Sequence, residues 1–585
     1  MKKTLLILLL IATVTVARAD DSKLSPELRG YHSNQQVQVI VQYAPGTQVN
    51  CNGLLGLLGC LLNDVVKLGG QILGQLPLIN GVVALLDGNG ITSLSNQSNV
   101  VYISLDRPLA PSLNSAAPAV NADFAWQSNY TGAGIGVALI DSGVSNHADL
   151  YQGYLPFSRV VYQKSFVPGN SSSADQYGHG THIAGLIAGD GISSTGIFFS
   201  KTFKGIAPGA KIINLRVLDA NGGATDSQVI AAINQAISLK SSYNIRVINL
   251  SLGRAVYESY KLDPLCQAVE KAWKNGIVVV VAAGNNGRFV PTQGYATVTS
   301  PGNDPYVITV GAMKTMGTPA RIDDQMASYS SKGPTAVDAI AKPDIVAPGN
   351  LLVSLEAPGS TLYNQYPGNR VPYSFYVNGG STAASSNYFT LSGTSMATGV
   401  VSGAVADLLQ KSPSLTPDQV KARLMKTAWK SLPAFSSVTD PATGITYTDQ
   451  DDVFTVGAGY LDIEAALTST EVVRGTAMSP VATYDANSGN VYLSSDPSAV
   501  WNTSAAWASS AVWGSSQFVA GAPTSTMSGT NALWGSNALW GSNALWGSNA
   551  LWGSNALWGS NALWGSNALW GSNALWGSSA AAGEQ

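Results

Sequence analysis

Gly136-Val137-Ala138-Leu139-Ile140-Asp141-Ser142-Gly143 is the stretch that decides the fold class of this chain. Its first five residues are small or aliphatic and show no polar alternation, so they predict a short strand that is buried on both faces. The strand ends at Asp141, and the backbone turns at Ser142 and Gly143. A carboxylate therefore lies at the carboxyl end of a buried strand, which is where α/β sheets bind their ligands.

Outward from this strand, the same pattern recurs over residues 120–467. Further buried strands are predicted at 247–250 and 277–282, and helices at 226–239 and 263–274. In the first helix, apolar residues return at helical spacing at Val229, Ile230, Ile233 and Ile237. Apolar strands that alternate with helices predict a parallel sheet with helices on both faces. The predicted fold class is α/β, doubly wound.

The composition describes a large, weakly charged protein. With 585 residues the chain is several times the typical domain of ~150 residues, which predicts two to four domains. Lys and Arg number 31 and Asp and Glu number 34, for a net charge of −3, and charged residues make up only 11%. Because no basic field exists to neutralise phosphates, we expect no nucleic-acid partner.

The amino terminus has the pattern of an export signal. Lys2 and Lys3 precede the run 5–16, which is apolar apart from two Thr, and Ala17-Arg18-Ala19 fits the rule for signal cleavage. We expect a signal peptide over 1–19 and a secreted protein, extracellular or associated with the cell surface. No integral membrane segment is expected, because no uninterrupted apolar run reaches the ~20 residues that span a bilayer.

Three segments place reactive side chains at strand ends and helix starts. Asp141 ends a strand, His179 begins an apolar helix in Gly178-His179-Gly180-Thr181-His182, and Ser395 begins another in Gly393-Thr394-Ser395-Met396-Ala397. A serine hydroxyl is a weak nucleophile that needs an adjacent base. In the order Asp, His, Ser, these segments resemble the subtilases, the subtilisin-like serine proteases.

The resemblance covers residues 120–467 and extends to four further stretches. These are Lys204-Gly205-Ile206-Ala207-Pro208, Val281-Ala282-Ala283-Gly284-Asn285-Asn286-Gly287, Ser330-Ser331-Lys332-Gly333-Pro334 and Lys342-Pro343-Asp344-Ile345-Val346-Ala347-Pro348-Gly349. Within the family the chain looks most like an AprX-type bacterial branch. The resemblance implies a serine endopeptidase acting on protein or peptide substrates. The competing interpretation, a binding protein on a protease scaffold, is opposed by the intact reactive residues.

The resemblance also implies a role for each site residue. Ser395 is the expected nucleophile, His179 the general base and then acid, and Asp141 the group that orients His179. The side-chain amide of Asn285 and the backbone N–H of Ser395 are the expected oxyanion hole. The substrate-binding residues implied are Ser251, Leu252 and Gly253 as the edge for an extended peptide, and Ala282, Ala283 and Gly284 as walls of the primary specificity pocket. These small walls favour large apolar or aromatic side chains.

The expected chemistry requires no cofactor. Asp149 matches a family position that can ligate calcium, but the loop 190–204 departs from the family pattern that completes such a site, so structural calcium stays open. His182 follows His179 at a spacing that metal ligands also use, yet no Glu or Cys cluster accompanies it, and we expect a structural histidine. A Tyr-rich insertion between Gly349 and Ser392 either rims the site or is an elaborated loop.

Residues 20–110 predict a small α+β domain. Strands are expected at 37–41, 82–86 and 100–103. The apolar segment 53–74 is an amphipathic membrane contact or, as we favour, a buried helix packed on the sheet. By resemblance, this domain is an inhibitory prodomain that the enzyme itself removes by a cut between 106 and 119. The family also implies a monomer.

From residue 475 onward only Asp485, Asp496 and Glu584 are charged. We expect a linker over 475–530, in which Trp501, Trp507 and Trp513 share a six-residue spacing, followed by eight copies of Asn-Ala-Leu-Trp-Gly-Ser over 531–578. Three interpretations of this tail stay open. It is a flexible spacer, a repetitive β-structure with Trp in its core, or a Trp ladder that contacts polysaccharide or the cell surface.

Overall fold

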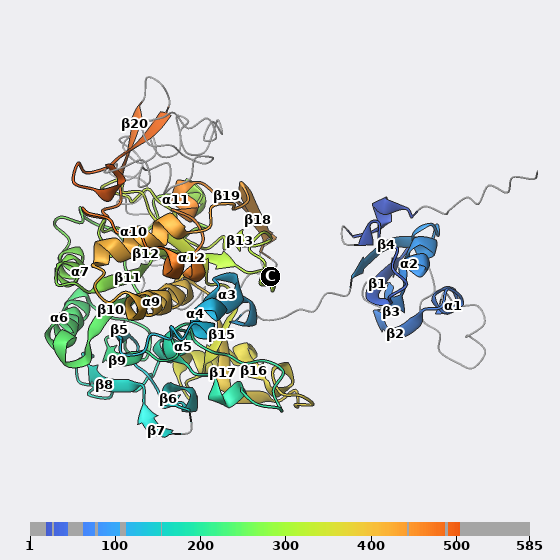
Figure 1. Ribbon diagram of the computed structural model, residues 1–585, viewed down its shortest axis with the longest axis horizontal. Helices are drawn as coiled ribbons and strands as arrows, with labels where there is room; N and C mark the ends of the chain where they lie inside the picture. The colour runs from blue at the N-terminus through green and yellow to red at the C-terminus, as the bar shows by residue number, and fades with distance from the viewer. Residues whose placement is uncertain are drawn as a thin grey trace, which may run out of the picture. The chain divides into compact units, whose positions relative to one another are not determined.

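The structure is a computed structural model of the full chain. It describes residues 19–25, 28–44, 62–76, 80–105, 113–153, 155–440, 444–485 and 490–502. The chain forms two compact units, residues 1–109 and 110–585 (Figure 1). Three predicted features lie outside the described residues: the expected signal peptide up to residue 18, the start of the expected cleavage region at 106–112, and the repeats at 531–578.

In its described part, the first unit is a four-stranded antiparallel sheet in the order β2-β3-β1-β4. The elements are η1 Asp21–Lys23, β1 Val37–Tyr43, α1 Leu62–Lys67, β2 Gln71–Leu76, β3 Gly81–Leu86, α2 Gly88–Ser95 and β4 Val100–Leu105. The three expected strands are present. The predicted helix over 53–74 is wrong at its carboxyl end, where β2 forms. Gly69 has a φ of +78°, and a Cβ at Gly70 would lie 2.6 Å from Leu86, so the chain turns there.

The second unit is built on an eight-stranded sheet in the part that the structure describes. Its order is β13-β12-β11-β10-β5-β9-β8, with β14 beside β12, and the described pairs are parallel except β12 with β13. The strands are β5 Gly136–Asp141, β8 Val160–Ser165, β9 Lys211–Arg216, β10 Ile245–Leu250, β11 Val278–Ala282, β12 Ile308–Lys314, β13 Gln325–Met326 and β14 Ile345–Pro348. The α/β fold class predicted from the buried strands is confirmed.

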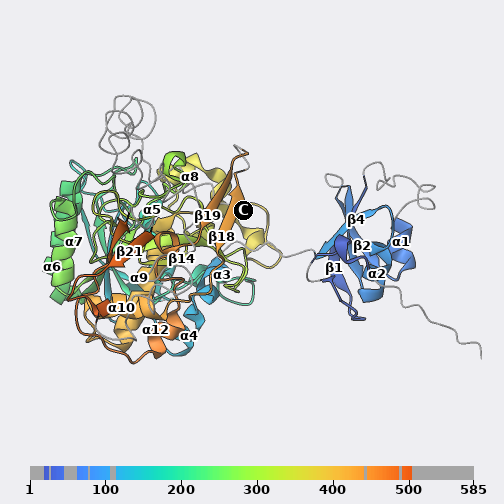
Figure 2. The same ribbon diagram turned by 90° about the horizontal axis from the view of Figure 1, so that it is seen from above.

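Helices cover both sides of this sheet. Helix α5 (His179–Ala188) packs on α9 (Thr394–Lys411), and α6 (Asp226–Tyr243) packs on α7 (Pro264–Lys274). Figures 1 and 2 show α6 and α7 together at one side, away from α5 and α9. Residues 394–409 of α9 are all buried, because this helix crosses β10, β11 and β12. The starts of α5 and α9 carry His179 and Ser395.

The Tyr-rich insertion is a folded element. Strands β15 (Leu352–Leu355), β16 (Arg370–Pro372) and β17 (Ala384–Leu391) form a small sheet in the order β15-β17-β16. Strand β15 packs on α5, and Tyr376 and Tyr388 are completely buried. The insertion therefore braces the helix that begins at His179.

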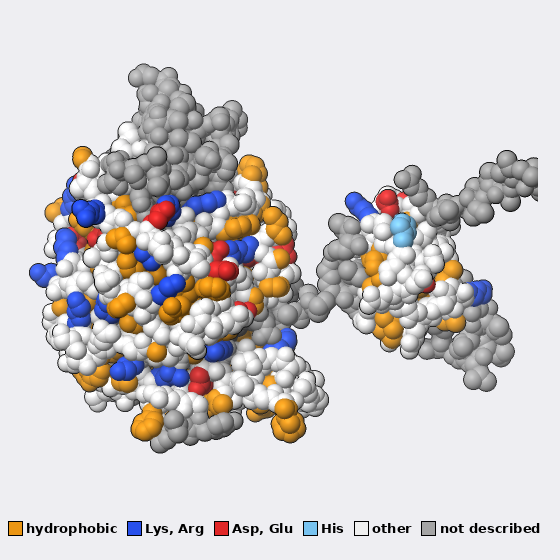
Figure 3. Space-filling model, in the orientation of Figure 1, with side chains coloured by type: hydrophobic (Ala, Val, Ile, Leu, Met, Phe, Trp, Pro, Cys, Tyr) orange, Lys and Arg blue, Asp and Glu red, His pale blue; other side chains and the backbone are white. Residues whose placement is uncertain are grey.

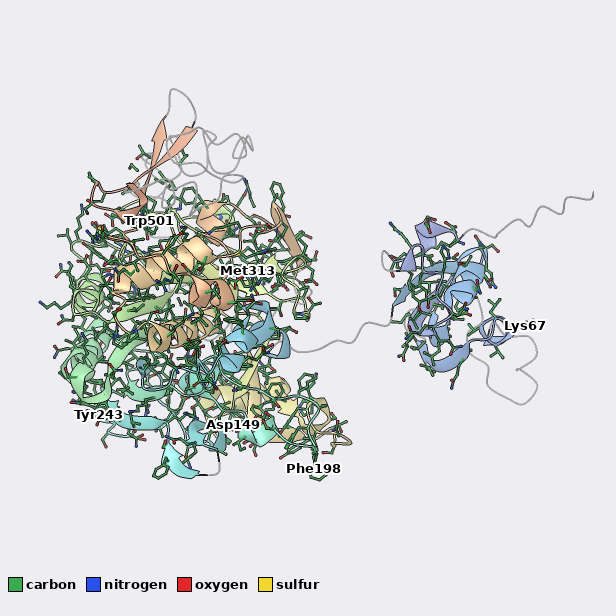
Figure 4. The ribbon with its side chains drawn as sticks, viewed as in Figure 1. Lys67, Asp149, Phe198, Tyr243, Met313 and Trp501 are labelled. Atoms are coloured by element: carbon green, nitrogen blue, oxygen red, sulfur yellow. The ribbon has the colours of Figure 1, made fainter. Side chains whose placement is uncertain are left out.

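The start of the expected linker is also folded. Strands β20 (Val481–Asp485) and β21 (Asn490–Ser494) form a hairpin, and Trp501 is only 2% exposed, with its indole N–H donating to the carbonyl of Met478 at 2.7 Å (Figure 4). The packed unit thus continues beyond residue 467, the expected end of the catalytic domain, and includes residues up to at least 502. The linker prediction is wrong for this part because burial of Trp501 depends on long-range contacts.

Shorter elements complete the second unit. They are α3 Leu113–Ala119, α4 Ala122–Gln127, η5 Ala148–Leu150, β6 Tyr151–Gln152, β7 Leu155–Ser158, η6 Ile192–Ser194, η7 Val290–Thr292, α8 Thr361–Gln365, η8 Pro367–Asn369, η9 Tyr373–Phe375, α10 Pro417–Thr427, β18 Phe435–Thr439, β19 Thr446–Gln450, α11 Val453–Val456, α12 Ile463–Thr468 and η10 Val500–Asn502. Among the described residues, no helix has both the length and the apolar character that crossing a membrane requires. Figure 3 shows Lys and Arg side chains dispersed over the visible face of this unit.

Candidate active site

Asp141 and His179 form a buried hydrogen-bonded pair. Asp141 is the last residue of β5, His179 is the first residue of α5, and their side chains are 0% and 3% exposed. His179 Nδ1 donates to Asp141 Oδ1 at 2.8 Å, and the same oxygen accepts the backbone N–H of Ser142 at 2.7 Å. Because an ionised carboxylate only accepts, the proton of neutral His179 lies on Nδ1 and leaves Nε2 as the base.

The surroundings of His179 favour its charged form. Burial lowers the pKa of His179, but the charge of Asp141, the hydrogen bond to it and the charge of Asp175 raise it, and the resulting pKa lies above the ordinary value. The pair is therefore arranged to accept a proton and to stabilise the imidazolium that results.

Ser395 is the second residue of α9 and is 2% exposed. Its hydroxyl donates to the carbonyl of Ser251 at 3.1 Å, and the Ser251 hydroxyl donates back to the carbonyl of Ser395 at 2.9 Å. These bonds fasten the start of α9 to the end of β10. Rotation about one side-chain bond redirects the Ser395 hydroxyl, and hydrogen bonds of this kind commonly rearrange when substrate binds.

Two N–H donors lie at the start of α9, one on Asn285 and one on Ser395 itself. Asn285 Oδ1 accepts both the backbone N–H and the hydroxyl of Thr394, at 2.9 and 3.0 Å, which orients the amide and leaves Nδ2 as a donor. In the first turn of α9, Met396 and Ala397 donate to the carbonyl of Gly393, whereas the N–H of Ser395 has no acceptor among the described residues. A Cβ at Gly393 would lie 3.3 Å from Asn285 Nδ2, so glycine keeps this space open.

This geometry has counterparts in known proteins, since residues 132–459 match the model of the subtilase family. The chain belongs to the subtilase family. It is 38% identical to serine protease AprX of Bacillus subtilis (strain 168), over 57% of this chain and 70% of the relative. It is 32% identical to subtilisin DY of Bacillus licheniformis, over 60% of this chain and 96% of the relative, and 33% identical to subtilisin E of Bacillus subtilis (strain 168), over 62% and 80%.

This subtilase is accordingly a serine endopeptidase, and its similarity to AprX agrees with the branch expected from the sequence. The four residues expected to carry the chemistry, Asp141, His179, Asn285 and Ser395, come from four separate segments of the chain. The structure brings Asp141 to His179 and Asn285 to the residue before Ser395.

The segments expected to hold substrate continue two neighbouring parallel strands. Ser251, Leu252 and Gly253 follow β10, and Ala282, Ala283 and Gly284 end and follow β11. A connection between them was not evident from the sequence. The N–H of Thr299 donates to the carbonyl of Ala283 at 3.0 Å, and Ser300 exchanges two backbone hydrogen bonds with Arg254. Residues 299 and 300 thus join the two segments, which no local motif signals.

Asp149 is the residue for which the sequence left calcium binding open. It is completely buried, its Oδ1 accepts the N–H of Ser193 at 2.9 Å, and its Oδ2 accepts the hydroxyl of Tyr388 at 2.7 Å (Figure 4 labels Asp149). Both carboxylate oxygens thus accept a hydrogen bond from the protein, which supports a structural role for Asp149. The described residues contain no group of three or more His, Cys, Asp or Glu side chains that could hold a metal ion.

His182 has the structural role expected for it. Its Nε2 lies 3.1 Å from the carbonyls of both Leu352 and Phe389, in β15 and β17. Burial lowers the pKa of His182 to about 3, so the ring is neutral and donates from Nε2. The side chain connects α5 to the insertion sheet.

Proposed function

We propose that this subtilase cleaves protein substrates by nucleophilic attack of Ser395, with His179 as general base and acid and Asp141 as its orienting carboxylate. The observation that carries the proposal is the buried 2.8 Å bond between His179 Nδ1 and Asp141 Oδ1, at the end of β5 and the start of α5. This bond leaves Nε2 available to take a proton.

In the first step the Ser395 hydroxyl attacks the carbonyl of the scissile bond and passes its proton to His179 Nε2. The imidazolium then protonates the leaving amine, and an acyl enzyme remains on Ser395. Water, deprotonated by His179, releases the acyl group. Asp141 stays ionised throughout, and its charge supports the positive ring.

The negative oxygen of the tetrahedral intermediate is stabilised by Asn285 Nδ2 and the N–H of Ser395. The support for this role is the pair of hydrogen bonds from Thr394 that fixes the orientation of the amide. A preorganised donor of this kind is worth ~10²–10³ in turnover, about 3–4 kcal/mol.

Substrate binds as an extended peptide beside Ser251, Leu252 and Gly253, and its side chain at the cleaved position enters between Gly253 and the wall of Ala282, Ala283 and Gly284. Ala282, Ala283 and Gly284 are buried, small and uncharged, which favours an apolar side chain. Thr299 and Ser300 close the space between these segments.

The enzyme is made as a secreted precursor. A signal peptide over 1–19 directs export, and the α+β unit of residues 20–110 acts as an inhibitory prodomain that the enzyme removes by a cut within 106–119. The compact sheet of this unit supports its separate identity. The repeats at 531–578 are a candidate contact to polysaccharide or the cell surface.

The replacement Ser395→Ala tests the proposal. In a protease-free host the variant should accumulate uncut after signal removal and should not digest casein, whereas wild type should show a new amino terminus within 106–119. Ser412→Ala, at the other end of α9, is the matched control and should mature normally. Normal maturation of Ser395→Ala in that host would contradict the proposed mechanism.

A further inference from the structure

A second carboxylate, Asp175, lies beside the Asp141–His179 pair. Its side chain is buried, and its Oδ1 accepts the hydroxyl of Ser142 at 2.8 Å, the N–H of Gly178 at 2.6 Å and the N–H of Tyr177 at 3.2 Å. Its Oδ2 accepts the N–H of Thr181 at 2.8 Å. Each of these four neighbours donates, so the carboxylate is the acceptor in every bond. Burial raises the pKa of Asp175 above its ordinary value, and the hydrogen bonds from Gly178, Thr181 and Ser142 act in the opposite direction.

These bonds join the two elements that carry Asp141 and His179. Ser142 directly follows Asp141, and its backbone N–H donates to Asp141 Oδ1. The Ser142 hydroxyl accepts the N–H of Gly180 at 2.8 Å and donates to Asp175. A closed circuit of hydrogen bonds therefore runs from the end of β5 through Ser142 and Asp175 to the residues on both sides of His179.

The same hydrogen bonds also cap the amino terminus of α5. Gly178 precedes the helix with a φ of 105° and has no side chain to satisfy the first N–H groups. Asp175 and Ser142 accept those of Gly178, Gly180 and Thr181 instead. A negative group at a helix start is stabilised by the unpaired N–H groups and the helix dipole.

We propose that Asp175 is a positioning residue for peptide-bond hydrolysis, which holds the start of α5 against Ser142 so that His179 Nε2 stays aligned with Ser395. The inference rests on the roles proposed for Asp141, His179 and Ser395. Asp175 acts through His179 and Ser142 and does not itself contact the reacting atoms.

The experiment compares the matured wild-type enzyme, with its tail intact, with the Asp175→Asn variant. The substitution keeps the shape of the side chain but replaces one acceptor oxygen by an NH₂ donor, which faces other donors. Misplacement of a catalytic group by about 1 Å can cost about 10²-fold in rate, so we expect kcat on a peptide substrate to fall by that order while KM changes little. Asp338→Asn is the matched control, because Asp338 also orders a loop, through Ser259 and Tyr260, and kcat should be unchanged.

The pH profile separates positioning from a general loss of structure. The charged and titratable groups around His179 are Asp141, Asp175 and His182, and Tyr177 and Arg216 also face Asp175. Because Asp175 favours the imidazolium, Asp175→Asn should shift the acidic limb of kcat/KM to lower pH, and Asp338→Asn should not shift it. Ser142→Ala keeps the charge of Asp175 but breaks the circuit, so kcat should fall with the acidic limb nearly unmoved. This variant also decides the question if Asp175→Asn does not fold.

Two outcomes would overturn the inference: wild-type kcat and an unshifted profile in Asp175→Asn, or wild-type kcat in Ser142→Ala. Labelling of wild type with a fluorophosphonate, located by peptide mass, tests the role of Ser395 separately from the positioning role of Asp175. Labelling of Ser395 together with full activity of Asp175→Asn removes only the positioning role. Absence of the label from Ser395 removes the proposed mechanism as well.

Discussion

At the scale of single residues, buried carboxylates give this protein a pH-dependent stability. Asp304 is completely buried, its Oδ2 has no hydrogen-bond partner among the described residues, and burial together with the charge of Glu270 raises the pKa of Asp304 to about 8. An unfolded Asp titrates near pH 3.9. The folded protein therefore holds a proton that the unfolded chain has already released, and the stability that this proton confers is present below about pH 4 and lost as pH rises towards 8.

The replacement Asp304→Asn should remove this dependence. The variant should gain stability relative to wild type as pH rises from 5 to 8, by at most about 1.4 kcal/mol per pH unit. Thermal unfolding at a series of pH values measures the difference, with both proteins carrying Ser395→Ala to prevent self-digestion. A constant difference between the two proteins over this range would show that Asp304 is ionised in the folded state.

At the scale of elements, the insertion sheet contacts Asp149 and the loop 190–204 through Tyr388. The Tyr388 hydroxyl in β17 donates to Asp149 and lies 2.8 Å from Ser194 Oγ. Removal of this hydroxyl leaves a buried carboxylate oxygen without its donor, at a cost of about 1–3 kcal/mol. Tyr388 therefore links the insertion sheet to Asp149.

Tyr388→Phe should lower the melting temperature, and Tyr151→Phe, which removes an exposed hydroxyl bonded to Asn146, should leave it unchanged. Differential scanning calorimetry measures both melting temperatures. An unchanged melting temperature of Tyr388→Phe would show that this hydroxyl does not stabilise the folded protein.

Several of these elements, and part of the active site, could be predicted from the sequence. Strands β5, β10 and β11 were predictable because the centre of a parallel sheet is buried on both faces and needs continuous Val and Ile. The segments around Asp141, His179 and Ser395 were recognisable because their residues are adjacent in the chain. Strand β2 was missed, because a short apolar run does not distinguish a helix from a strand. Thr299 was missed because its partner Ala283 lies on another segment. Asp175 lies in the same segment as His179, but its hydrogen bond with Ser142, which links this segment to the end of β5, depends on the fold.

At the scale of the whole molecule, the segment 476–502 completes the catalytic unit. The hydroxyl of Ser479 donates to Asp344 Oδ1 at 2.5 Å, and this buried carboxylate also pairs with Lys342 and Lys421. The N–H of Ala477 donates to Asp418 in α10 at 2.7 Å, and Trp501 packs in a small apolar core. The first Trp of the six-residue series is thus an anchor on the catalytic unit.

A chain ending after residue 502 should therefore fold and melt like the full protein, whereas one ending at 475 should lose the burial of Trp501, worth about 3–5 kcal/mol, and expose the Lys342–Asp344–Lys421 group. Melting temperatures in the Ser395→Ala background measure this difference. Equal stability of the two truncated proteins would contradict an anchoring role. The protein that ends after residue 502 is also the right control for co-sedimentation with cell envelope, because it lacks the repeats but keeps the fold.

Covalent labelling tests whether Ser395 is the nucleophile that acts together with Asp141 and His179. Active enzyme is treated with phenylmethylsulfonyl fluoride, digested, and analysed by peptide mass. We predict one adduct, on Ser395, that appears in step with the loss of casein digestion and is absent from His179→Ala. Full loss of activity with the adduct on another residue, or full activity with Ser395 modified, would contradict the account.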